Sequence, residues 1–169
     1  MKALLIIAPR DFRDEEFFHT KDELEKSGIS VEVASAKTGE ARGMLGGKVR
    51  VELSLEDIKP ETYDAVVFVG GSGSSVYFND KTALATARRS YEAGRVVGAI
   101  CIAPVILANA GVLTNKRATV WNGEFVKMIE KGGAKYTGKS VEVDGKVVTA
   151  NGPGAAREFG RALAKLLKV

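Results

Sequence analysis

The chain has 169 residues, of which 45% are hydrophobic and 27% are charged, and its formal net charge is +4. This composition excludes an intrinsically disordered chain. The length is typical of one domain with a sizeable core, so we expect a single domain over residues 1–169. The basic residues are scattered as singles and pairs. Nucleic-acid binding would require a basic patch or stripe, so we expect no nucleic-acid partner.

Cysteine and histidine each occur once, as Cys101 and His19. These counts exclude an intramolecular disulfide and metal sites built from several cysteines or histidines, and we expect no metal or cofactor. The N-terminal apolar run spans only residues 3–8 before charged residues follow. It is too short for a membrane span or a signal sequence, which predicts a cytoplasmic protein without membrane contact. The absence of glutamine beside many charged residues hints at a thermophilic source.

The chain opens with the pattern of a β-α-β unit. An apolar strand is predicted over 2–8, an amphipathic helix over 14–27, and a second strand over 29–34. The stretch over 38–60 is less regular, and alternating apolar residues predict a short edge strand over 49–53.

Two further buried strands are predicted over 65–69 and 96–100, with a helix over 81–93 between them. The second of these strands runs directly into a helix over 104–110. The remaining predicted elements are a strand near 118–120, a helix near 124–131, a hairpin over 141–149 that turns on Asp144-Gly145, and a helix over 158–167. This alternation predicts an α/β fold with a doubly wound, mostly parallel sheet and helices on both faces, as in flavodoxin-like proteins.

Open α/β sheets form their sites at the carboxyl ends of strands, and Cys101 comes directly after one buried strand. A residue between a strand and a helix lies on a tight turn, with its side chain projecting from the sheet edge. Helix amides and the helix dipole favour its anion, so the sequence predicts a reactive thiol with a pKa below the usual value of about 8.5. The alternative is a small buried hydrophobic residue without reactivity.

Two other segments follow predicted strand ends. The glycine run over 70–75 either supplies amides to an oxyanion or is a plain flexible turn, and it lacks the Gly-Lys-Ser/Thr of a phosphate-binding loop. Asp14, Glu15 and Glu16 begin the first helix. Acidic residues there are expected from the dipole alone, but one that points inward would have a raised pKa and serve as an acid or base.

His19 and Trp121 complete the candidate residues. His19 would act as a base only if it touches the cysteine, and otherwise it is a surface or packing residue. Trp121, the only tryptophan, lines a pocket, forms an interface or closes the core.

Four segments, taken in order, resemble the ThiJ/PfpI superfamily. They are MKALLIIAPRDFRDEEF, AVVFVGGSG, VVGAICIAPVILANAGVL and VDGKVVTANGP. The resemblance covers nearly the whole chain and implies a class I glutamine-amidotransferase-like fold. The superfamily includes the parkinsonism-associated deglycase and the intracellular proteases, so the resemblance also implies a stress-response protein that forms a dimer or hexamer.

The resemblance implies roles for particular residues. Cys101 falls on the superfamily's nucleophilic cysteine, and Glu16 falls on the acidic residue that hydrogen-bonds this cysteine. The resemblance places oxyanion- or substrate-binding groups at Gly71, Ser72 and Ile102, and a loop near the same site at Asn151 and Pro153.

The sequence departs from members of the superfamily at three places. Those members read Ala-Ile-Cys-His-Gly-Pro at the cysteine, whereas here Ile102 replaces the histidine. They also draw an acidic residue from the glycine loop of a neighbouring subunit, at the position of Ser75. Members that act on glyoxals often have a histidine near residues 120–121, and this chain has none there. Without a base, the thiol depends on its own pKa and on Glu16.

Three hypotheses for the function follow. The first is a glyoxalase or protein deglycase that acts on a small reactive carbonyl or a glycated protein, with Cys101 as nucleophile and Glu16 as proton shuttle. The second is a non-catalytic redox sensor or binding module with an oxidisable Cys101. The third is an intracellular cysteine peptidase, which would need a base, an oxyanion hole and a leaving-group acid together.

Overall fold

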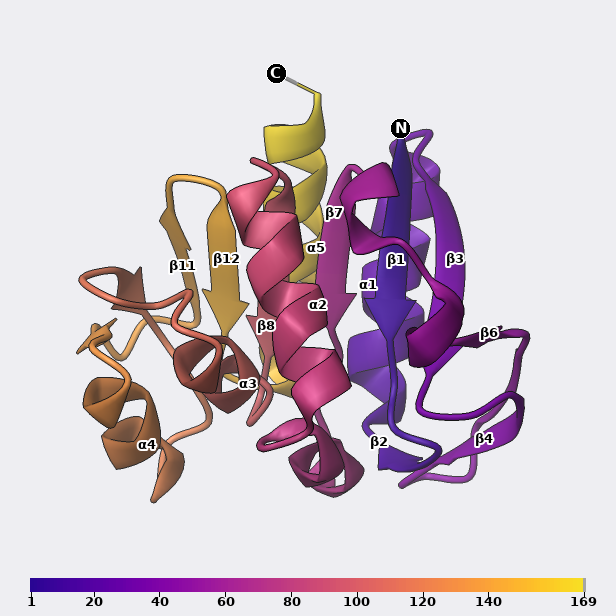
Figure 1. The fold of residues 1–169 in the computed structure, drawn as a ribbon, viewed down its shortest axis with the longest axis horizontal. Helices are drawn as coiled ribbons and strands as arrows, with labels where there is room; N and C mark the ends of the chain where they lie inside the picture. The colour runs from indigo at the N-terminus through magenta and orange to yellow at the C-terminus, as the bar shows by residue number, and fades with distance from the viewer. Residues whose placement is uncertain (169) are drawn as a thin grey trace.

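A seven-stranded sheet forms the centre of the computed structural model, which describes residues 1–168 (Figure 1). Its strand order is β11-β12-β8-β7-β1-β3-β6. The strands of this sheet are β1 (Lys2–Ile6), β3 (Ser30–Ser35), β6 (Leu53–Ser54), β7 (Ala65–Phe68), β8 (Val96–Ile100), β11 (Val141–Asp144) and β12 (Val147–Ala150). All neighbouring strands pair in parallel except β11, which runs antiparallel to β12.

Helices cover both faces of the sheet. In Figure 1, α2 and α3 lie in front of the strands, and α1 and α5 pack against each other behind them. The helices are α1 (Asp14–Lys26), α2 (Lys81–Glu92), α3 (Pro104–Asn109), α4 (Phe125–Lys131) and α5 (Ala156–Leu167). The expected fold class, a doubly wound and mostly parallel sheet with helices on both faces, is confirmed.

The chain winds outward from β1 in both directions. It passes first to β3 and β6 on one side, and then returns to β7, β8 and β12 on the other side. The order therefore reverses between β1 and β7, whose carboxyl ends leave a crevice in sheets of this kind. The loops after β1, β7 and β8 meet at this edge.

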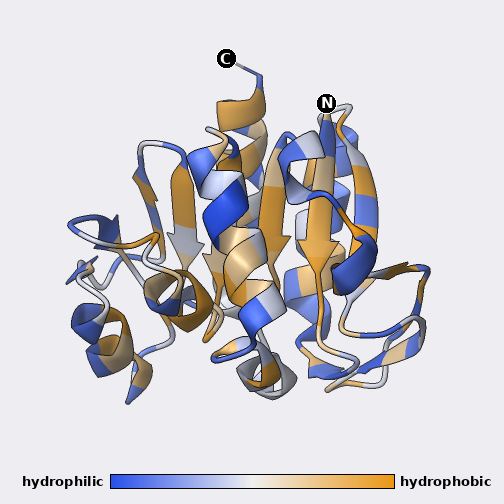
Figure 2. Cartoon of the chain, in the orientation of Figure 1, coloured by the Kyte–Doolittle hydropathy of each residue, from blue (hydrophilic) through white to orange (hydrophobic). Residues whose placement is uncertain are grey.

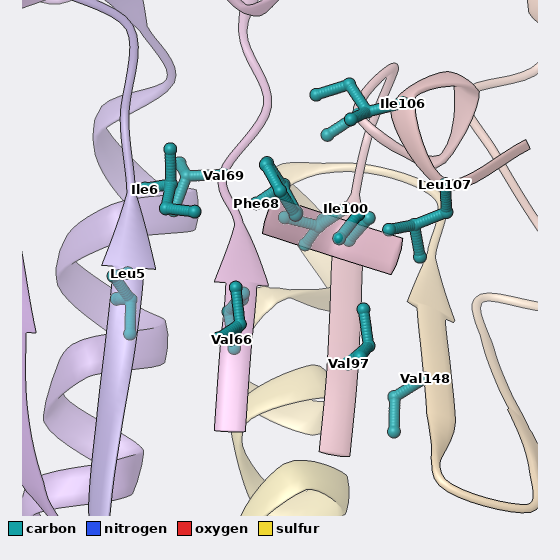
Figure 3. Packing of buried hydrophobic residues seen from close by; sticks show 14 of the residues in the cluster. Leu5, Ile6, Val66, Phe68, Val69, Val97, Ile100, Ile106, Leu107 and Val148 are labelled. Carbon is teal, nitrogen blue, oxygen red and sulfur yellow. The ribbon is translucent and has the colours of Figure 1, made fainter. Parts of the chain in front are cut away.

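The core consists of the strands and the inner faces of the helices. The central strands β1, β7 and β8 are mostly hydrophobic along their length (Figure 2), as expected for strands that are buried on both faces. Residues of neighbouring strands and of α3 pack together in Figure 3, where Val66, Val97 and Val148 lie in the sheet and Ile106 lies in α3.

Two smaller sheets were not predicted. One contains β2 (Arg10–Phe12), β4 (Gly39–Gly43) and β5 (Lys48–Val51), and the other contains β9 (Arg117–Ala118) and β10 (Lys135–Tyr136). The single edge strand predicted over 49–53 is wrong, because its first part pairs with β4 and only its end, β6, joins the main sheet.

The terminal hairpin is displaced by one residue from the prediction. Asp144 pairs with Val147, so the two loop residues are Gly145, with φ of 62°, and Lys146. The glycine run also differs from a plain flexible turn, because residues 72–77 form a 3-10 helix.

Gly98 of β8 should not tolerate a larger side chain. A Cβ atom at this position would lie 3.0 Å from Leu163 and 3.1 Å from Phe159 of α5. Gly98→Val should therefore lower the free energy of unfolding by about 1–3 kcal/mol through overpacking. Urea unfolding measures this change, and Gly154→Ala is the control, because a Cβ at Gly154 meets nothing within 4 Å. Equal stability of the two variants would contradict the tight packing of α5 on β8.

Candidate active site

Cys101 lies on a strained turn at the carboxyl end of β8. Its φ of 67° is in the left-handed region, which a side chain other than glycine rarely adopts. Two backbone hydrogen bonds hold the turn. The amide of Cys101 donates to the carbonyl of Ala150 (2.9 Å), and the amide of Trp121 donates to the carbonyl of Cys101 (2.8 Å). Strain that is held in this way is typical of functional positions.

Glu16 brings a carboxyl group to the same place from the first turn of α1. The side chain is fully buried, and neither carboxyl oxygen has a well-formed hydrogen bond within residues 1–168. The polar groups beside it are the Cys101 thiol and the backbone of Gly70. A buried carboxyl without firm partners is costly, so its presence needs a functional reason.

Gly70 and Gly71, directly after β7, allow these groups to meet. A Cβ atom at Gly70 would lie 2.5 Å from both the Cβ of Cys101 and the Oε1 of Glu16. Gly71 has φ of 102°, and a Cβ there would collide with the backbone of residues 11–13. The amide of Arg13 also donates to the carbonyl of Gly70 (2.9 Å). The loops after β1 and β7 therefore pack backbone against backbone around the cysteine.

Burial raises the pKa of Glu16 to about 8, against smaller opposing contributions from the Cys101 thiol and the Gly70 backbone. The carboxyl is therefore mostly protonated at neutral pH.

The expectation of a lowered thiol pKa is wrong in direction. Burial, and then the charge of an ionised Glu16, raise the pKa of Cys101 to about 12, while the backbone of Gly71 and Ile102 acts in the opposite direction. The predicted helix effect is weak because α3 has only six residues and begins three residues after the cysteine. The Glu16 carboxyl and the Cys101 thiol interact directly, so loss of the first proton gives a single negative charge that is shared between them.

A pocket of about 460 Å³ opens above the thiol. Five residues that the sequence places at the site line it together with Cys101, and they are Gly71, Ser72, Ile102, Trp121 and Pro153. Asn151 lines an adjacent hollow that shares Trp121 and Pro153. His19 is half-buried on α1 and lines neither hollow, so the pocket contains no imidazole.

Further lining residues were not singled out by sequence reasoning. They are Arg13, Met44, Glu124 and Phe125. Ser75 also lines the pocket, and the sequence indicated it only as the position where protease-like members have an acidic residue. Met44 comes from the loop between β4 and β5, which the sequence presented only as glycine-rich. No single-sequence signal links this loop to the cysteine.

Asp14 holds that loop over the pocket. Its buried carboxylate accepts hydrogen bonds from the amides of Leu45 (2.8 Å) and Gly47 (2.7 Å). A Cβ atom at Gly43 or Gly47 would collide with this carboxylate. The amide of Met44 donates to the carbonyl of Phe12 (2.8 Å). The first turn of α1 thus carries both the carboxyl beneath the thiol and the anchor of the pocket wall.

Two other features bear on the kind of site. Within residues 1–168, no group of three His, Cys, Asp or Glu side chains is placed to hold a metal ion. The helices of the same range include none that is long and apolar enough to cross a membrane.

A sequence profile of the DJ-1/PfpI family matches residues 1–166. The chain belongs to this family. The resemblance to the ThiJ/PfpI superfamily is thereby confirmed.

Three relatives illustrate the family. An uncharacterised protein of Methanocaldococcus jannaschii is 43% identical over 99% of this chain and 82% of its own length. A deglycase of Pyrococcus abyssi is 36% identical over 98% of this chain and 99% of its own. The glutathione-independent glyoxalase DJR-1.2 of Caenorhabditis elegans is 30% identical over 98% of this chain and 88% of its own length. The family therefore includes proteins that are named as enzymes.

Among solved structures, the ThiJ/PfpI domain protein of Brachyspira murdochii superimposes with a TM-score of 0.96. It is 31% identical, and the match covers 99% of this chain and 96% of that one.

Glu16→Gln should remove a pH dependence of stability. Burial raises the pKa of Glu16 from 4.5 to about 8. Between these two pH values the folded protein therefore keeps a proton that the unfolded chain releases. Wild-type stability therefore falls as the pH rises through this window, by at most about 1.4 kcal/mol per pH unit. The variant lacks this contribution. Urea unfolding at about pH 5 and about pH 8 tests the difference, and equal slopes would show that Glu16 is already ionised in the fold.

Proposed function

We propose that the protein is a cysteine-dependent glyoxalase or deglycase, with Cys101 as nucleophile and Glu16 as proton shuttle. The substrates are α-dicarbonyls such as methylglyoxal, or the adducts that these form with proteins. One observation carries the proposal: a fully buried carboxyl with a raised pKa lies against a thiol on a strained turn, at the base of an open pocket. The names of the deglycase and glyoxalase relatives support it.

The first step is addition of sulfur to an aldehyde. When the pair has lost one proton, the Glu16 carboxylate takes the thiol proton while the sulfur of Cys101 bonds to the aldehyde carbon. The carbonyl oxygen becomes an alkoxide, which protonated Glu16 neutralises to give a hemithioacetal. The backbone amides of Gly71 and Ile102 beside the sulfur favour the developing negative charge.

The second step moves a hydrogen between carbons. Ionised Glu16 removes the proton from the carbon bonded to sulfur, and the resulting enediol is reprotonated at the neighbouring carbon. The product is a thioester of Cys101, and water hydrolyses it to lactate and the free thiol. Methylglyoxal and one water give lactic acid, so the sequence needs no oxidant or cofactor. A carboxyl with a pKa near neutrality suits both directions of proton transfer.

Peptide hydrolysis fits the same pocket poorly. An amide is a weak electrophile, so a peptidase needs a separate base and an acid for the leaving group. The chain's one histidine, His19, does not line the pocket, and the position beside the cysteine is Ile102. An aldehyde needs less activation, which favours dicarbonyl substrates.

Variants of the two central residues test the proposal. Cys101→Ala should abolish methylglyoxal consumption, and Glu16→Gln should lower kcat by roughly a hundredfold or more. The wild-type rate should rise with pH up to about 8, where the carboxyl becomes ionised. His19→Gln, which lies outside the pocket, should retain activity. Lactate formation by the purified proteins is the measurement, and full activity of Cys101→Ala would refute the assignment.

A redox function is the second candidate. A neutral Glu16 and the amides of Gly71 and Ile102 surround the sulfur, and these groups donate to the oxygens of a sulfinate. Intact-mass measurement after mild peroxide treatment tests this function. Addition of two oxygen atoms at Cys101, without any turnover of methylglyoxal, would favour a sensor over an enzyme. A thiol inert to peroxide would eliminate the sensor.

A further inference from the structure

The small sheet of β2, β4 and β5 has a row of positive charges on its outer face. Arg10 of β2 lies opposite Arg42 of β4, and Arg42 lies opposite Lys48 of β5. All three side chains are exposed. Residues that are directly paired across neighbouring strands point to the same face of a sheet. Basic residues that are isolated in the sequence therefore form one continuous cation row (Arg10, Arg42 and Lys48).

The backbone of the small sheet keeps this row on the solvent side. The inner face packs on the protein, where Phe12, Ala41 and Val51 are buried. Asp11 has φ of 60°, and the register shifts between Arg10 and Phe12. This irregularity lets Phe12 turn inward while Arg10 stays exposed. The cation row is thus a consequence of strand pairing and not of the rotamers of flexible side chains.

Few carboxylates oppose the cation row. Glu40 of β4 pairs with Arg42 at 3.1 Å. Within residues 1–168, neither Arg10 nor Lys48 forms an ion pair or a side-chain hydrogen bond, and the adjacent Asp11 forms no ion pair either. Three cations against the carboxylates of Glu40 and Asp11 leave the row net positive. Like charges that lie directly opposite each other destabilise a sheet, so this arrangement favours binding of an anion.

The fourth cation of this face is balanced separately. Arg50 of β5 lies opposite Glu40 and lines a hollow together with Glu32 and Glu52. These two carboxylates place its charge in an acidic setting. The free positive charge of the face therefore lies along the cation row.

We propose that the cation row binds a linear phosphate chain, such as inorganic polyphosphate. A guanidinium forms paired hydrogen bonds with phosphate oxygens, and a lysine ammonium binds phosphate as a point charge. The three positions follow one another at the strand spacing of about 4.8 Å, so the row extends about 10 Å across the sheet. A chain of linked phosphates presents negative charge without interruption over such a length.

Two other polyanions match the row less well. Side chains on one face of an extended peptide recur at every second residue, about 6.6 Å apart, which exceeds the spacing of the row. Single-stranded nucleic acids are commonly held by aromatic side chains that stack on the bases. The exposed residues of β4 and β5 are all charged, and they are Glu40, Arg42, Lys48 and Arg50. The face therefore recognises charge alone.

Calorimetric titration with tripolyphosphate tests this binding. In about 50 mM salt, Arg10→Gln and Lys48→Gln should each weaken binding by roughly three- to tenfold. The affinity of the wild-type protein should fall as salt is added, and each substitution should make this dependence shallower. Arg88→Gln is the matched control, because Arg88 is an exposed arginine of α2 that pairs with Glu92, away from the small sheet. Its affinity should equal that of the wild type.

Urea unfolding separates binding from a structural role of the same residues. The two row variants should be at least as stable as the wild type without ligand, because each removes a like charge opposite Arg42. Tripolyphosphate should raise the unfolding midpoint of the wild type more than that of either variant. A loss of stability in both variants without ligand would contradict the assignment of the row to binding.

Other outcomes would also overturn the proposal. They are tripolyphosphate binding no tighter than that of inorganic phosphate, and an unchanged affinity in both row variants. Tighter binding of an oligouridylate or of a glutamate peptide with the same number of charges would assign the face to nucleic acid or to an acidic protein instead. The titration does not involve Cys101, so its result is independent of the proposed function.

Discussion

The contact between the Glu16 carboxyl and the Cys101 thiol depends on three loops that meet where the strand order reverses. The carboxyl comes from the helix after β1, the thiol from the turn after β8, and the space between them exists because Gly70 after β7 has no side chain. Packing of the surrounding core keeps the Glu16 carboxyl away from water, while the Cys101 thiol lines the pocket. The fold thus maintains a buried ionisable group that would otherwise favour solvent.

Electrostatics at this contact differ from those of a simple activated thiolate. A short helix and two backbone amides favour the anion, but burial and an adjacent acid oppose it more strongly, and the pKa of Cys101 rises. The carboxyl in turn holds its proton to about pH 8. A protonated pair of this kind suits an electrophile that takes up a proton as the sulfur attacks it, and the oxygen of an aldehyde does so.

Local patterns were sufficient to predict the fold class and most elements of the main sheet. Buried strands such as β1 and β8 are continuous apolar runs. The helix predicted over 81–93 corresponds to α2, and the carboxylate of Asp80 caps it by accepting a hydrogen bond of 2.9 Å from the amide of Ala83. β2 and β4 were missed because they are short and polar, and the strand predicted over 49–53 was assigned to the wrong sheet because its partner β4 was not recognised. Glu124 and Met44 were missed because their approach to the pocket is a tertiary property.

The Asp14 carboxylate binds only backbone amides of the loop between β4 and β5, so the anchoring does not depend on the identity of the side chains at residues 44 and 45. Residue 44 faces the pocket, while the anchor and the two flanking glycines, Gly43 and Gly47, keep the path of the chain. The side chain at position 44 can therefore change without altering the path of the loop that carries it. The shape of the pocket wall is in this way independent of the contact between Glu16 and Cys101.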